Sequence, residues 1–162
     1  MVKKILPLIF CLLVLCSCSK AAGFEPERYI DAAFTIDADG FEISGNVKVN
    51  SYEDITFTFT SPEGLTHMTL KVTKDSYLAD IGGVRDELSP GMLPDNAPIK
   101  LFAESLKTFL FENNEFEKTG KEEYCVSSEI LGETVTAAFD AEGLLKTIRG
   151  ENTSITIKTA VG

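Results

Sequence analysis

The chain has 162 residues, which suits one domain, and its 44% hydrophobic and 25% charged residues are ordinary for a globular protein, so disorder of the whole chain is excluded. Its formal net charge is −10 and becomes −12 without residues 1–17, because these hold two lysines and no acidic residue. Such a surface repels phosphate backbones and anionic lipid headgroups, so we expect no nucleic-acid partner.

Residues 1–17 have the pattern of an export signal. A basic start, Lys3-Lys4, precedes an apolar run of about a dozen residues, which is too short to span a bilayer comfortably. The run ends in Leu15-Cys16-Ser17-Cys18, which resembles a bacterial lipobox with a small residue just before the modified cysteine, Cys18. Cys16 fits less well, because the bulky Leu15 would take the position before it.

The lipobox resemblance implies a lipid anchor. In such proteins the chain is cut before the cysteine, the thiol carries a diacylglyceryl group, and the new N-terminus is often acylated. Two or three acyl chains, at about 0.8 kcal/mol per buried CH₂, hold a protein on a membrane. We therefore predict a bacterial lipoprotein on the extracytoplasmic face of the cell membrane, lipidated at Cys18, with residues 18–28 as lipidated N-terminus and tether. An uncleaved N-terminal anchor and an ordinary secreted protein are the alternatives.

Strand patterns fill most of the chain from residue 29 to residue 160. Residues 55–60 alternate strictly between apolar side chains and threonine, Ser61-Pro62-Glu63-Gly64 is a turn signature, and residues 65–72 alternate again, so a hairpin is expected there. The other expected strands are 29–37, 42–50, 76–81, 84–88, 122–130, 134–140, 144–149 and 154–158, with turns between them.

One helix interrupts the strands. Asn96 is a candidate N-cap, and Pro98 stands in the first turn, where its missing N–H group costs nothing. Apolar residues then recur at helical spacing, which predicts a helix over about 98–113. We expect a mainly β (α+β) domain over residues 29–160, in which this helix packs across one face of a curved antiparallel sheet.

Two hairpin segments are similar to those of a known family. Residues 134–148 combine an alternating strand, an Asp-x-x-Gly turn and a short strand, and residues 55–72 form the hairpin described above. Both resemble segments of the LolA/LolB/LppX-like lipoprotein fold. The resemblance implies a half-open β-barrel whose apolar hollow holds acyl chains, and some members carry lipids or lipoproteins between membranes.

This resemblance gives two hypotheses for function. The first is an anchored protein that binds or carries a lipid or other hydrophobic ligand between sheet and helix. The alternative is a non-enzymatic structural or interaction domain of the cell envelope with a filled core, since a domain of this size must bury such residues anyway. The candidate lining residues are Phe57, Phe59, Met68, Leu70, Phe102, Leu106, Phe109 and Phe139.

We expect no catalytic residue, metal or cofactor. His67, the one histidine, shares its alternation phase with polar residues, which predicts a solvated position, and no oriented partner or nucleophile accompanies it. Residues 37–40 lack the remaining ligand positions of a calcium loop. Cys125 would be the one thiol outside the export segment, either buried in a strand or paired with another molecule.

Overall fold

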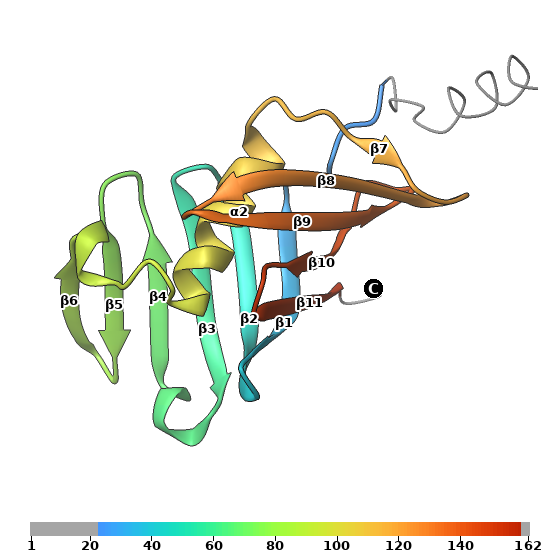
Figure 1. The fold of residues 1–162 in the computed structure, drawn as a ribbon. Coiled ribbons are helices and arrows are strands. Elements are labelled where there is room, and N and C mark those ends of the chain that lie inside the picture. Colours follow the sequence, from blue (N-terminus) through green and yellow to red (C-terminus); the bar gives the residue numbers. More distant parts are fainter. Residues whose placement is uncertain (1–22, 160–162) are drawn as a thin grey trace, which may run out of the picture.

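The structure, a computed structural model, describes residues 23–159. These residues form a single open antiparallel sheet of eleven strands and one α-helix, α2 (Pro98–Phe111), so the expectation of a mainly β domain with one helix is confirmed. Figure 1 shows that the sheet curls, and that α2 lies in the bend. The strands are β1 (Ile30–Ala38), β2 (Phe41–Ser51), β3 (Asp54–Ser61), β4 (Met68–Val72), β5 (Tyr77–Ile81), β6 (Val84–Leu88), β7 (Glu117–Lys118), β8 (Glu123–Ile130), β9 (Glu133–Asp140), β10 (Leu145–Arg149) and β11 (Thr153–Thr159).

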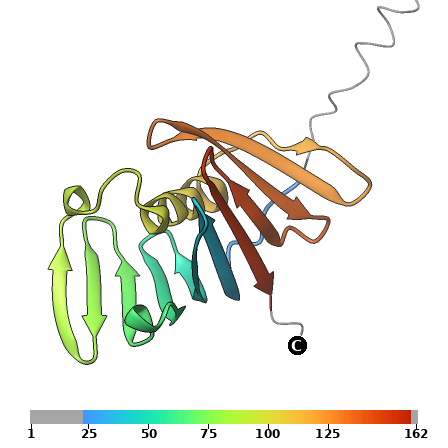
Figure 2. The same cartoon turned by 60° about the horizontal axis from the view of Figure 1, so that its bottom comes forward.

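The sheet consists of two meanders that meet in its middle. Its strand order is β6-β5-β4-β3-β2-β1-β11-β10-β9-β8-β7, so the first strand of the chain pairs with the last. The β1–β11 register places Phe34 opposite Ile157 and Ile36 opposite Ile155. All four side chains are buried, so this junction is part of the core. Figure 2 shows the two meanders on either side of the helix, with the β8–β9 hairpin crossing above it.

Strict alternation decides which face of β3 is buried. Ile55, Phe57 and Phe59 are buried, while the residues between them are half-buried or exposed. Successive strand residues point to opposite faces, so these three side chains lie together on the concave face beneath α2. The register continues the apolar surface into β4, where Val72 lies opposite Ile55 and Leu70 opposite Phe57.

The ends of α2 differ from the expectation. Pro98 is the first helical residue, a position that suits the fixed φ of proline. The N-cap position, however, is occupied by Ala97, which makes no side-chain hydrogen bond, so the prediction of Asn96 as N-cap is wrong. At the other end the helix stops at Phe111 rather than at residue 113. There the Asn114 side chain donates hydrogen bonds to the carbonyl oxygens of Thr108, at 2.7 Å, and Glu112, at 3.1 Å. The Thr108 carbonyl oxygen also accepts from the Glu112 amide, at 3.2 Å, so the side chain adds a second donor there and gives the Glu112 carbonyl group, just beyond the helix, a partner.

Two further details correct the expected strands. The β3–β4 connection is longer than a tight turn, because Glu63–Leu65 forms a short 3-10 helix and β4 begins only at Met68. The hydroxyl group of Thr66 closes this loop by donating to the Glu63 carbonyl oxygen at 2.9 Å. Strand β7 was not expected at all, because two residues are too few to show a period.

The Asp-x-x-Gly turn between β9 and β10 has the expected form. The Asp140 carboxylate accepts hydrogen bonds from the backbone N–H groups of Glu142 and Leu144, and Gly143 takes a φ of +84°. Burial raises the pKa of Asp140, but the ion pair with Lys146 at 2.8 Å and the two amides outweigh it and lower the pKa below its usual value. A positive φ is available to glycine without steric cost.

Candidate functional site

The eight candidate lining residues lie together between the sheet and α2. Seven of them are at most 3% exposed, and Met68 is half-buried at the edge of the same apolar cluster. They come from β3, β4, α2 and β9, which are far apart in the sequence, and the curl of the sheet brings these elements around the helix.

Aromatic rings in this region contact one another directly. The ring centroids of Phe57 and Phe102 are 5.2 Å apart, and Phe34 of β1 lies 5.8 Å from Phe57 and 5.3 Å from Phe102. Ring pairs at these separations are in van der Waals contact, and such pairs stabilise a core beyond the apolar area that they bury. The middle of the sheet–helix interface is therefore occupied by the protein's own side chains. Phe34 belongs to this cluster, although it was not among the candidates.

Helix α2 is enclosed on almost every side. Its buried residues include Lys100, Ser105 and Lys107 as well as the apolar ones. The long stem of a lysine can be buried while its charged end reaches a partner. Accordingly, the Lys100 ammonium group binds the Asp95 carboxylate at 2.6 Å and the Leu93 carbonyl oxygen at 3.2 Å.

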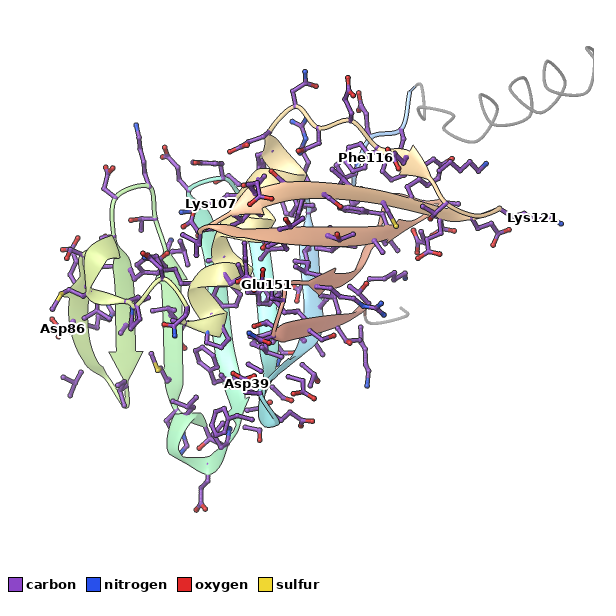
Figure 3. The ribbon with its side chains drawn as sticks, viewed as in Figure 1. Asp39, Asp86, Lys107, Phe116, Lys121 and Glu151 are labelled. Atoms are coloured by element: carbon purple, nitrogen blue, oxygen red, sulfur yellow. The ribbon has the colours of Figure 1, made fainter. Side chains whose placement is uncertain are left out.

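A second cluster of polar side chains connects the helix to β5 by hydrogen bonds. The Tyr77 hydroxyl group donates to Glu104 Oε1 at 3.1 Å, and the Lys107 ammonium group reaches the same oxygen at 2.9 Å. Lys107 also lies 5.8 Å from the centre of the Tyr52 ring, and Figure 3 shows it where α2 meets the sheet. Burial, together with the charge of Glu104 and this hydrogen bond, raises the pKa of Tyr77 well above its usual value. We call these residues the Glu104 seam.

Ser105 is the exception among the buried polar side chains. Its Oγ atom is inaccessible and has no hydrogen-bond partner within the described residues. An unpaired buried hydroxyl group costs free energy, so Ser105 is a weak point of the interface rather than a stabilising feature.

The concave face continues beyond α2 as an exposed apolar surface. Strand pairing places Met68 opposite Ile81, and Ile81 opposite Val84, so one row of apolar side chains crosses β4, β5 and β6. Exposure rises along the row, to 57% at Ile81 and 73% at Val84. We call Met68, Ile81 and Val84 the apolar shelf.

Surface pockets also occur, and two of them have mainly polar linings. One of about 370 Å³ lies behind the end of α2, between the 113–117 loop and Cys125–Ser127 of β8. Another of about 340 Å³ lies where the start of α2 meets the turns after β1, β8 and β10. Within residues 23–159, no group of three or more His, Cys, Asp or Glu side chains is placed to hold a metal ion. That part of the chain also contains no helix long and apolar enough to cross a membrane.

The N-terminal segment of the described chain is docked on the sheet. The Phe24 ring stacks on Tyr124 with centroids 4.0 Å apart and meets the edge of Phe116 at 4.8 Å. The Glu27 amide donates to the Gly143 carbonyl oxygen at 2.9 Å. A Cβ atom at Gly143 would stand 2.8 Å from the Glu25 carbonyl oxygen, so the glycine permits this close approach. We call residues 24–27 the strap; they carry no periodic pattern by which sequence could have found them.

The remaining candidates are distributed as follows. Cys18 lies outside the described residues. His67 is exposed, as expected, but it lies in the loop before β4 rather than in a strand. Cys125 is half-buried in β8, where its sulfur atom lies 3.5 Å from the Thr119 hydroxyl group.

No protein-family model matches the chain, and no curated protein matches it.

Proposed function

We propose that this chain is a bacterial cell-envelope lipoprotein, held on the extracytoplasmic face of a membrane by lipids on Cys18, with a filled domain that acts through its surface. The observation that carries the anchor is the ordered series of a basic start, a short apolar run and Leu15-Cys16-Ser17-Cys18. The first docked residue, Phe24, follows Cys18 by only six positions, so the domain would stand close to its membrane.

The filled interior rests on contacts in the sheet–helix interface. The Phe34, Phe57 and Phe102 rings fill the space between sheet and helix, where the resemblance to half-open barrels would place a ligand. Displacing α2 to admit an acyl chain would break the Glu104 seam and expose residues that are now fully buried. The arrangement of a curved sheet around one helix supports a LolA-like origin for the fold, without the hollow that carriers use.

The anchor is tested with matched cysteine variants of the full chain, expressed in bacteria. We expect the wild-type protein and Cys16→Ser to be recovered in the membrane fraction, with an N-terminal peptide that starts at residue 18 and carries a diacylglyceryl mass. Cys18→Ser should lose both the processing and the lipid mass. Lipidation that persists in Cys18→Ser and disappears in Cys16→Ser would contradict the assignment.

A second candidate, binding of an apolar ligand, is favoured by the apolar shelf. Its two most exposed side chains, Ile81 and Val84, lie on the concave face beside the buried cluster. Native mass spectrometry of the chain from residue 19 onward, purified without detergent, distinguishes the two functions. A lipid-sized adduct that disappears in Val84→Asp would support binding on the shelf. A clean mass without adduct supports the filled interaction domain.

A further inference from the structure

We propose that the strap fixes how the domain stands on its membrane, so that the end built from the 112–116 loop, β7 and the β9–β10 turn faces the lipid surface. The inference rests on the proposed anchor at Cys18 and adds to it an orientation and a membrane-facing surface. We call this part of the molecule the tether end.

The first step is the length of chain between anchor and strap. Five residues, 19–23, separate Cys18 from Phe24. A fully extended chain advances about 3.5 Å per residue, so Phe24 cannot lie further than about 20 Å from the lipidated cysteine. A domain held at that distance through a free linker could still rotate, and its orientation therefore depends on what holds the next residues.

The second step is that the next residues are held. Phe24 lies against Tyr124, Phe116 and Phe139, so three rings from the 112–116 loop, β8 and β9 surround it. Three residues later the chain crosses the β9–β10 turn, where the Glu27 amide donates to the Gly143 carbonyl oxygen. From Phe24 onward the chain is thus fixed to the margin of the domain.

The third step is where these contacts lie in the molecule. Figures 1 and 2 both show the described N-terminal segment leaving the domain beside β7, at the end opposite the β5–β6 turn. Figure 3 places Phe116 at the tether end and Asp86, in β6, at the far side of the sheet. The apolar shelf, which borders the β5–β6 turn, is therefore turned away from the membrane that carries the protein.

The charge of the tether end excludes electrostatic attraction to the lipid headgroups as the cause of this orientation. Residues 112–123 hold five glutamates and two lysines, so this surface is not drawn to anionic headgroups. A basic patch would orient a domain by attraction, whereas here the docking of the strap has to supply the orientation.

The chain contains no tryptophan, and this gives a direct test. We would place a single tryptophan at Asn113, exposed at the tether end, or at Val84, exposed at the opposite end. The full-length lipidated protein, purified from bacterial membranes, is reconstituted into phosphatidylcholine vesicles that contain a trace of dansyl-labelled lipid. Energy transfer from tryptophan to the dansyl group then reports which end is nearer the bilayer.

We expect several-fold more transfer from Asn113→Trp than from Val84→Trp. Adding Phe24→Ala to each protein should make the two signals similar, while Phe41→Ala, which removes an exposed phenylalanine elsewhere, should preserve the difference. Equal or reversed transfer in proteins with an intact strap overturns the orientation even if the protein floats with the vesicles. Protein that carries no lipid and does not float overturns the anchor itself, and the two failures are thereby separated.

Discussion

Gly45 of β2 lies where two phenylalanine rings and a neighbouring strand meet. It pairs with Phe34 on one side and Phe59 on the other, and the centroids of these rings are 6.2 Å apart. A Cβ atom here would overlap the Thr58 carbonyl oxygen and stand 3.0 Å from the Phe34 ring. The absent side chain therefore allows the rings to close over the strand, a known way of compensating a glycine within a sheet.

We predict that Gly45→Ala destabilises the domain by about 1–2 kcal/mol, because the added Cβ atom would be overpacked against a backbone atom. This cost exceeds the stability that is gained when the unfolded chain loses the conformational freedom of glycine. Gly64→Ala is the matched control, since a Cβ atom there meets nothing within 4 Å, and its effect should be near zero or slightly stabilising. Urea unfolding of both variants measures the difference. Equal stabilities would mean that β2 and β3 can separate locally without cost.

At the scale of elements, the sequence predicted ten of the eleven strands and the helix. Most of these are long enough to repeat an apolar pattern, whereas the almost wholly exposed β6 was predicted from the glycine turn that precedes it. What periodicity could not supply is the partner of each element. Nothing in the sequence around Tyr77 indicates that its hydroxyl group meets Glu104, 27 positions later. The same holds for the docking of Phe24 on Tyr124, which depends on the register of β8 and on the path of the strap.

The Glu104 seam makes stability depend on alkaline pH. The pKa of Tyr77 is raised in the folded state by burial and by Glu104, so folding favours the protonated phenol. This contribution is complete below the unfolded-state pKa of about 10 and is lost as the pH rises above it. We predict that Tyr77→Phe loses about 1 kcal/mol at pH 7, through the missing hydrogen bond, but declines less steeply than wild type above pH 10.

Urea midpoints at pH 7, 9, 10.5 and 11 would measure this slope. Tyr29→Phe, at a residue 65% exposed, is the control and should follow the wild-type curve. If Tyr77→Phe and wild type declined in parallel above pH 10, the Tyr77 hydroxyl group would not be coupled to folding.

At the scale of the whole molecule, acidity dominates the surface. From residue 18 onward the chain carries 25 acidic against 13 basic side chains, and close ion pairs such as Lys71–Asp54, at 2.9 Å, engage part of the basic ones. The excess negative charge repels itself in the compact state. Composition alone predicted this acidic surface. It could not distinguish a filled interior from a hollow one, because side chains such as Phe57 and Phe102 are equally hydrophobic in a packed core and in the lining of a cavity.

We therefore predict that sodium chloride stabilises the domain at neutral pH. Raising the concentration from 10 mM to 0.5 M shortens the screening length to a few ångströms and should raise the melting temperature by several degrees. Near pH 4.6, the isoelectric point of the chain, the same addition should have little effect. A melting temperature that falls with salt at pH 7 would show that the attraction within ion pairs exceeds the overall repulsion.

The pairing of β1 with β11 has a consequence for how the chain is made. Synthesis releases the N-terminal part first, so β1 to β6 emerge with the inner edge of β1 still open. Ile36 and Phe34 find their partners, Ile155 and Ile157, only when the last strand is released. Until β11 has emerged the sheet stays incomplete, so β1 keeps an open inner edge while all the strands between β1 and β11 are being made.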